Sequence, residues 1–291
     1  MARVSLAPSE RVTVSAGGHP LYFADLEQAL EGPMPGDAGG LERLSLGALR
    51  RLHRFLGRSR PAEGPLVVEC TTTVPRQVGL AGSSAVIIAT IRAACARWRV
   101  PIGPFQMSEM ALATEVEDLG IAAGPMDRVV QAYDRVMVMD LAPPRAEERY
   151  VPLDAALLPP LLVAWVPGGG ASSHVTHSDL RVRFDRGDEG VVRIMTKLRG
   201  LVDQGVEALR TGDHEGFADL VDENFRLRCA VTLVSRPDQA MVSIARDLGA
   251  AAKLCGSGGA VVIVPRTGVA LSEVARDLES EGFRTCTPKT R

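Results

Sequence analysis

A glycine- and serine-rich turn runs directly into a long apolar segment over residues 74–95, VPRQVGLAGSSAVIIATIRAAC. Gly79 and Gly82 can adopt conformations closed to other residues and can let a ligand approach the backbone closely. Ser83 and Ser84 fall where the apolar segment predicts the start of a helix, so their hydroxyls and the free N–H groups of the first turn face the helix end. Because that end carries the positive pole of the helix dipole, the junction is suited to an anion such as phosphate.

A plain serine-capped helix after a glycine turn would give the same pattern. Other glycine-rich signatures fit less well, since the stretch lacks the GxxxxGK[ST] of a P-loop, the GxGxxG of a dinucleotide site and the GxSxG of a nucleophile elbow. A phosphate loop and a simple capped helix therefore both stay open on these residues alone.

Hydrophobic periodicity predicts alternating strands and helices in the first half of the chain. Strands are expected over 2–15, 66–74 and 134–141, and helices over 41–57, 83–98, 105–119 and from 126 to 133. The proline-rich stretch 141–160 is the best candidate for a domain boundary. We therefore expect an N-terminal domain over 1–155 and a C-terminal domain over 156–291.

The second half predicts a strand, three amphipathic helices, a glycine turn with a second strand, and a last helix followed by a short strand. These elements are expected over 161–166, 189–211, 214–230, 236–249, 255–264 and 271–281. Strands and helices mixed without strict βαβ alternation favour an α+β fold.

Composition narrows the class of partner. With 291 residues, 46% of them hydrophobic, the chain can bury a large core. A net charge of −2 gives no reason to expect nucleic acid or an anionic membrane, so a small-molecule partner is expected. Five scattered cysteines without CxxC spacing, and no apolar run of signal-peptide or membrane-span length, favour a cytoplasmic protein. Lysine is scarce, at positions 197, 253 and 289 only.

The segment PRQVGLAGSSA resembles the second signature of the GHMP kinases, small-molecule kinases in which it forms the phosphate-binding loop. Further segments, including DLGIAAGPMDRVVQAY, HSDLRVRFDRGDE, ENFRLR and GAAAKLCGSGGAVVIV, follow in the order found in plant-type glucuronokinases. The resemblance spans about residues 70–264. It implies a two-domain GHMP kinase fold with an N-terminal nucleotide-binding domain, a C-terminal α/β sandwich-like domain, and ATP and Mg²⁺ as cofactors.

The resemblance also implies a set of nucleotide-binding residues in two glycine-rich stretches. They are Gly79, Leu80, Ala81, Gly82, Ser83 and Ser84 in the first stretch, and Gly256, Ser257, Gly258 and Gly259 in the second. The second stretch has a supporting role beside the phosphate loop, and a tight turn before a strand is its plain alternative.

Two carboxylates take functional positions by the same resemblance. Asp127 matches the catalytic aspartate of the family, and a carboxylate there can accept the proton of the attacking hydroxyl. Magnesium prefers hard oxygen ligands, so Glu115 and Ser84 are expected to hold it. A solvated surface charge is the ordinary alternative for any single carboxylate.

The arginine- and histidine-rich stretch 172–189 is suited to an anionic acceptor, because arginine offers a planar fork for a carboxylate. His177 and Arg181 are the preferred contacts, with Arg76 as a third. A solvated polar loop is the alternative. The resemblance makes glucuronate, phosphorylated at its anomeric hydroxyl, the best guess for the acceptor.

The first GHMP signature, a strand and loop of the kind ARVGLLGNPSD, has no counterpart here, since MARVSLAPSERVTV aligns with the segment that follows it in the family. Two alternatives therefore stay open. One is a kinase for another anionic acceptor, such as a nucleoside or a different sugar acid, and the other is a nucleotide-binding pseudokinase. The oligomeric state, including a homodimer, is left open.

Overall fold

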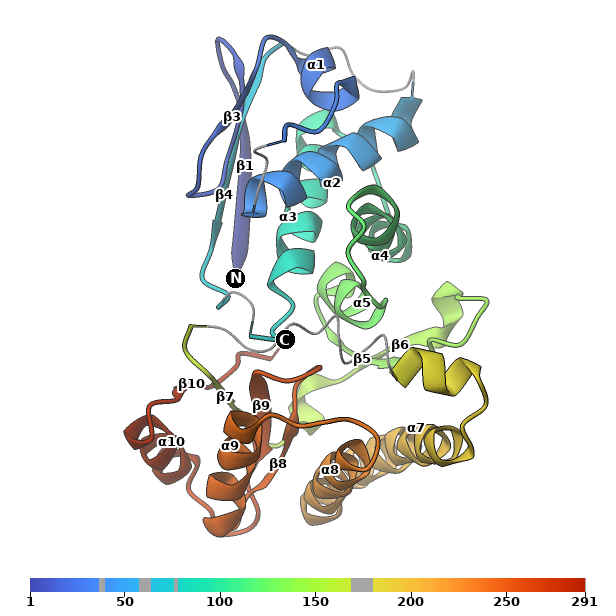
Figure 1. Ribbon diagram of the computed structural model, residues 1–291, viewed down its shortest axis with the longest axis vertical. Coiled ribbons are helices and arrows are strands. Elements are labelled where there is room, and N and C mark those ends of the chain that lie inside the picture. Colours follow the sequence, from blue (N-terminus) through green and yellow to red (C-terminus); the bar gives the residue numbers. More distant parts are fainter. Residues whose placement is uncertain (37–39, 58–63, 76–77, 169–179, 291) are drawn as a thin grey trace. The chain divides into compact units, whose positions relative to one another are not determined.

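The computed structural model describes residues 1–36, 40–57, 64–75, 78–168 and 180–290. The chain divides into two compact units, one made of Met1–Val74 with Ala81–Pro152 and the other of Pro75–Leu80 with Leu153–Arg291. Both units combine helices with a sheet (Figure 1), as an α+β fold requires. The segment Pro75–Leu80 belongs to the second unit although it lies within the first half of the chain. A single boundary near residue 155 does not describe this division.

The first unit is built on a four-stranded sheet in the order β1-β4-β2-β3. Its strands are β1 (Ala2–Pro8), β4 (Leu66–Thr72), β2 (Val12–Ser15) and β3 (Leu21–Phe23). The single strand predicted over 2–15 is wrong, because exposed residues 9–11 interrupt it. The two resulting strands flank β4, with β1 antiparallel and β2 parallel to it.

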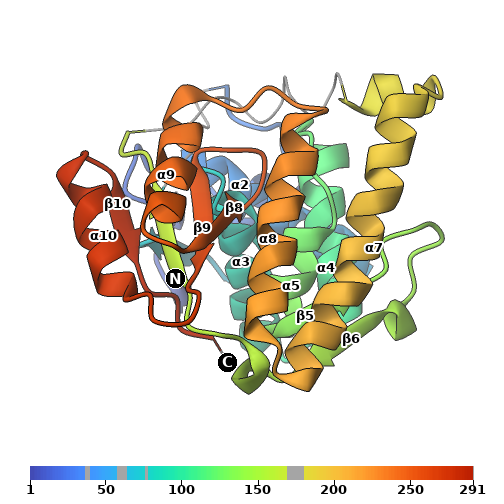
Figure 2. The same cartoon turned by 90° about the horizontal axis from the view of Figure 1, so that it is seen from below.

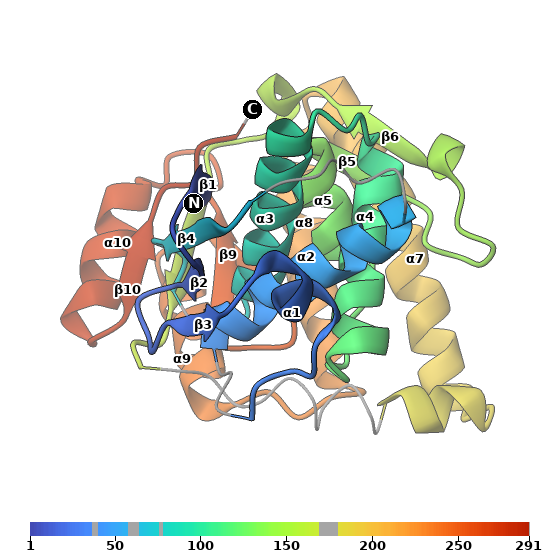
Figure 3. The ribbon, with the colours of Figure 1, turned by 90° about the horizontal axis from the view of Figure 1, so that it is seen from above.

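Helices cover one face of this sheet (Figure 3). Helices α1 (Leu26–Glu31), α2 (Gly40–Leu56) and α3 (Gly82–Trp98) contact the sheet, and α4 (Pro104–Ala113) and α5 (Met126–Tyr133) pack on α3. Helix α3 packs against β1, α2, α4 and α5, and its fully buried Ile87 and Ile91 join Leu46 and Leu52 of α2 in one core. This burial anchors the helix whose first turn was predicted to face a phosphate.

The helix predicted over 105–119 changes geometry near its end. Helix α4 stops at Ala113, and a single π-helical turn follows over Thr114–Asp118, where the N–H of Leu119 donates to the carbonyl of Thr114 at 3.1 Å. Such turns insert a residue into a helix and redirect side chains, often at functional sites. Here the turn carries Glu115.

A two-stranded ladder joins β5 (Val136–Met139) to β6 (Tyr150–Leu153). Strand β6 lies within the proline-rich stretch 141–160, which was predicted to contain the domain boundary. Short 3₁₀ turns over Glu147–Arg149 and Ala155–Leu157 flank it.

The second unit contains an antiparallel sheet in the order β10-β7-β9-β8. Its strands are β10 (Arg284–Cys286), β7 (Leu162–Trp165), β9 (Ala260–Val264) and β8 (Ala251–Leu254). The helices are α7 (Glu189–Thr211), α8 (His214–Cys229), α9 (Arg236–Asp247) and α10 (Leu271–Ser280). Helices α9 and α10 pack on the sheet, α8 packs along β8, and α7 lies against α8 (Figure 2).

The predicted helices of this unit agree with the structure to within two residues at each end. Strand β8 was not predicted, because the segment AAKL carries a lysine and little β-branched character. Over the described ranges, no helix has both the length and the apolar character needed to cross a membrane.

Candidate active site

The turn before α3 adopts a left-handed backbone at two positions. Gly79 has a φ of +74° and Ala81, the residue that precedes the helix, has a φ of +56°. A non-glycine residue in this region is strained by about 1 kcal/mol or more. No side chain caps the helix at Ala81, so the first N–H groups of α3 are not taken by a serine cap. The alternative of a serine-capped helix is therefore wrong.

The two serines of the first turn make different hydrogen bonds. The Ser83 hydroxyl donates to Glu115 Oε1 at 2.8 Å. Ser84 is fully buried, and its hydroxyl donates to the carbonyl of Ala81 at 3.0 Å. The structure thus brings Ser83, rather than Ser84, to Glu115.

Glu115 is completely buried and forms an ion pair with Arg128. Arg128 donates from Nε to Glu115 Oε2 at 2.5 Å, and its Nη2 contacts the same oxygen. Its Nη1 donates to the carbonyl of Gly124 at 2.8 Å and lies 3.4 Å from Asp127 Oδ2. One guanidinium therefore connects both predicted carboxylates.

Asp127 and Arg128 occupy the first turn of α5. An amphipathic pattern buries Arg128, Val129 and Ala132 and leaves the Asp127 side chain 36% exposed. On the same helix, Gln131 donates from Nε2 to the carbonyl of Ala81 at 3.0 Å. Helix α5 thus contacts both the start of α3 and the π-helical turn, and it presents Asp127 as the accessible carboxylate.

The oxygen atoms near Glu115 can be compared with the ligands that were predicted for Mg²⁺. Glu115 and the Ser83 hydroxyl supply hard oxygens of the kind that Mg²⁺ prefers. Ser84 does not lie with them, and Arg128 already contacts Glu115 Oε2. The described residues contain no group of three or more His, Cys, Asp or Glu side chains able to hold a metal. The donor chemistry therefore fits a cation that is held largely by a ligand's own oxygens, as Mg²⁺ with a nucleotide is.

In the second unit, the glycine turn over 256–259 is braced by Asp238. Gly258 and Gly259 have φ values of +134° and +85°. The N–H of Gly259 donates to Asp238 Oδ1 at 2.8 Å, and Ser235 Oγ donates to Asp238 Oδ2 at 2.8 Å. Asp238 is 3% exposed and begins α9, where the spacing S-x-x-D marks a helix start. That spacing was the available sequence signal for this residue.

Gly79 lies against this second turn. A Cβ added to Gly79 would collide with the carbonyl oxygen of Gly258, and one added to Gly256 would lie 3.4 Å from the carbonyl oxygen of Gly79. The two predicted glycine stretches are therefore in backbone contact, which only glycine permits at Gly79. Ser257 lies between Gly256 and Gly258, the two glycines of this turn that contact Gly79.

Of the three residues predicted to bind the acceptor, the structure describes one, Arg181. Arg76 and His177 lie outside the described residues. Arg181 is 78% exposed and pairs with Asp185 at 2.8 Å, four residues along the chain. Among the described residues, no hydrogen bond or ion pair joins Arg181 to another predicted site residue.

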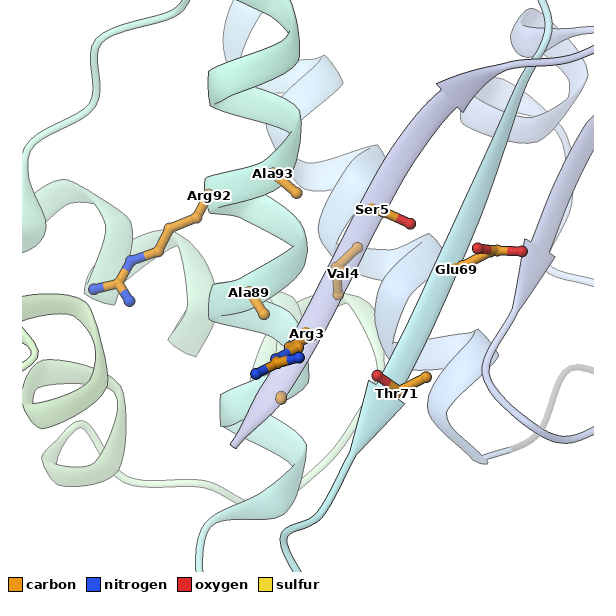
Figure 4. Close-up of a pocket in the computed structure, with 9 residues that line it drawn as sticks. Arg3, Val4, Ser5, Glu69, Thr71, Ala89, Arg92 and Ala93 are labelled. Carbon is orange, nitrogen blue, oxygen red and sulfur yellow. The ribbon is translucent and has the colours of Figure 1, made fainter. Parts of the chain in front are cut away.

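A cavity of about 720 Å³ lies in the first unit beside β1 (Figure 4). Its lining comes from β1, β4 and α3 and includes Arg3, Glu69, Thr71 and Arg92. Arg92 is engaged by the carbonyl oxygens of Gln131 and Ala132, each at 2.8 Å. None of the predicted site residues that the structure describes lines this cavity, so it is separate from the cluster around Glu115.

The sequence and the fold both match known kinases. Residues 43–135 match the model of the GHMP kinases N terminal domain, and residues 206–284 match that of the GHMP kinases C terminal. The chain belongs to the GHMP kinase family, as its two-unit α+β architecture and its glycine turns indicate. It is an ATP-dependent phosphotransferase that acts on a hydroxyl group.

Two curated relatives come from Arabidopsis thaliana. Glucuronokinase 1 is 30% identical over an alignment of 276 positions, and the match covers 90% of this chain and 75% of the relative. Probable glucuronokinase 2 is 34% identical over an alignment of 201 positions, and the match covers 66% of this chain and 55% of the relative. A mevalonate kinase from Methanococcus jannaschii shares the fold, with a TM-score of 0.76 at 15% identity, over 100% of this chain and 88% of that one.

Proposed function

We propose that this protein is a sugar kinase that transfers the γ-phosphoryl group of ATP to a sugar acid, with glucuronate and its anomeric hydroxyl as the best candidate. The identity of 30–34% to relatives named as glucuronokinases supports this acceptor class. The observation that carries the proposal is the cluster of Asp127, Arg128, Glu115 and Ser83 in one hydrogen-bonded group within a GHMP kinase fold.

Asp127 is proposed to be the catalytic residue. Its half-exposed carboxylate can contact an acceptor hydroxyl and take its proton as that hydroxyl attacks phosphorus. Phosphoryl transfer depends chiefly on positioning and charge stabilisation. The contact with Arg128, at 3.4 Å, supports an orienting role for that guanidinium toward Asp127.

The nucleotide is proposed to contact the residues of both glycine stretches. In the first unit these are Ala81, Gly82, Ser83 and Ser84, where the uncapped N–H groups of α3 favour phosphate oxygens. In the second unit they are Gly79, Leu80 and the turn Gly256, Ser257, Gly258 and Gly259. The glycines of this group pack closely through their backbones, which lets a nucleotide approach the backbone directly.

Mg²⁺ is proposed as the companion of ATP, and when bound it neutralises charge on the phosphates. Glu115 would hold it, together with a hydroxyl from the first turn of α3. The earlier expectation was Ser84, but the hydrogen bond between Ser83 and Glu115 makes Ser83 the better candidate. Arg76, His177 and Arg181 are proposed as acceptor contacts on the family resemblance alone.

A panel of acceptors with Mg-ATP, read by ADP release, tests this function. The panel includes glucuronate, galacturonate, glucose and mevalonate, so that the charge and the ring of the acceptor vary separately. Turnover is expected with glucuronate and is expected to be much weaker with glucose, which has the same ring without the carboxylate. Turnover confined to a neutral sugar or to mevalonate would overturn the sugar-acid assignment.

A further inference from the structure

Two basic side chains of the second unit lie beside the glycine turn and have no carboxylate partner in the described part of the chain. Arg228, at the end of α8, donates from Nη2 to the carbonyl of Gly256 at 3.1 Å. Lys253, in β8, donates from Nζ to the carbonyl of Leu254 at 2.9 Å. Within the described ranges, neither side chain forms an ion pair with an aspartate or a glutamate, although most other arginines on α8 and α9 do.

Their partial burial makes this arrangement unfavourable in the absence of a ligand. Arg228 Nε is buried and has no hydrogen-bond partner among the described residues, a condition that is unfavourable for a charged donor. Burial lowers the pKa of Arg228 and the pKa of Lys253, and the Arg228 charge lowers that of Lys253 further. The two positive charges are therefore close enough to repel each other.

The pair is placed where both glycine stretches meet. Gly256, which accepts from Arg228, is also the residue whose added Cβ would approach the carbonyl of Gly79. Lys253 precedes the turn by three residues, at the end of β8. A group bound here would contact two cations and backbone free of side chains.

We propose that Arg228 and Lys253 form a binding site for an oxyanion, either a phosphate group or a carboxylate. Arginine recognises such groups through its planar fork, and lysine adds a compact point charge. A bound oxyanion would supply an acceptor for Arg228 Nε and offset the repulsion between the two cations. The choice of oxyanion rests on the proposed function, whose two substrates carry such groups: the nucleotide has phosphates and the sugar acid has a carboxylate.

Calorimetric titration of the intact protein with ADP, inorganic phosphate, glucuronate and glucose tests the site without turnover. The variants R228M and K253M are expected to weaken the binding of ADP and phosphate, or of glucuronate, by at least about tenfold. Glucose binding should not change. A loss in the ADP and phosphate arm identifies a phosphate subsite, and a loss in the glucuronate arm identifies a carboxylate subsite.

R226M is the matched control, because Arg226 lies on the same helix, is 68% exposed and pairs with Glu223. It should bind every ligand as the unchanged protein does. A second readout separates binding from folding: K253M should raise the melting temperature of the ligand-free protein, since it removes an uncompensated buried charge. A purely structural lysine would lower that temperature when replaced.

Unchanged affinity of R228M and K253M for all four ligands would overturn the site, as would failure of the unchanged protein to bind any of the three oxyanions. Binding of ADP or phosphate that depends on Arg228 and Lys253, in a protein that phosphorylates no acceptor, would leave the site standing and refute the proposed function alone.

Discussion

Glu115 and Arg128 form an ion pair that is closed to solvent, with side chains 0% and 6% exposed. The carboxylate comes from the π-helical turn Thr114–Asp118 and the guanidinium from the first turn of α5. Two buried charges remain stable only while each has its partner, because removing one leaves the other desolvated. The pair therefore fixes the turn that carries Glu115 relative to the helix that carries Asp127.

Replacing Arg128 with Met should lower the free energy of unfolding by about 3–5 kcal/mol, the usual loss when one member of a buried pair is removed. Urea denaturation followed by circular dichroism measures this loss. The double variant E115Q/R128M should recover much of the stability, because it removes both charges together.

The control for this pair is Arg145, whose bond to Glu109 is 2.7 Å long but whose partners are about one-third exposed. R145M should change the free energy of unfolding by no more than about 1 kcal/mol. Equal losses for R128M and R145M would show that burial does not set the strength of the Glu115–Arg128 pair.

Ser83 and Ser84, in the first turn of α3, should differ in their effect on turnover. S83A removes the donor to Glu115 Oε1 and should lower kcat by about 10–100-fold, the range found when a partner of a metal-binding group is lost. S84A removes a bond to the Ala81 carbonyl and should cost about 1 kcal/mol of stability with a smaller change in kcat. Steady-state kinetics at varied Mg²⁺ concentration measures both.

If turnover by S84A depends more strongly on the Mg²⁺ concentration than turnover by S83A, Ser84 is the metal ligand, as the family resemblance predicts. It would also mean that the Ser83–Glu115 bond does not reflect the arrangement in the active complex.

Gly79 and Gly212 share a φ of +74°, but their surroundings differ. A Cβ at Gly79 would collide with the Gly258 carbonyl, whereas one at Gly212 would meet nothing within 4 Å. G212A should therefore cost only the conformational strain of about 1–2 kcal/mol. G79A should cost more and should also weaken ADP binding, as thermal unfolding and calorimetry would show. A G79A protein as stable as G212A would contradict the backbone contact between the two glycine stretches.

The sequence predicted the two candidate carboxylates but not the guanidinium that connects them. Glu115 and Asp127 stood out through a motif, whereas Arg128 was one of many arginines and followed Asp127 without a pattern of its own. Its role depends on α5 burying that face and on the π-helical turn directing Glu115 inward. A helical period of 3.6 cannot reveal such a turn, so residues 105–119 were predicted as one regular helix.

Local patterns also failed where tertiary pairing decides the element. Val4 and Val14 fall in one β-rich stretch, yet they face Cys70 and Val68 on opposite edges of β4. The long helices of the second unit were predicted closely, because their apolar periodicity is strong and their starts carry Asp188, Asp213 and Ser235 as caps.

The central claim, phosphoryl transfer to a sugar acid with Asp127 as the base, is tested most directly by phosphorus NMR of the product. Wild-type protein with Mg-ATP and glucuronate should yield a phosphate ester coupled to the anomeric proton. D127N should bind ADP normally and form this product about 10²–10⁴ times more slowly. Product formation by D127N at the wild-type rate, or no phosphorylated sugar acid from the wild-type protein, would contradict the account.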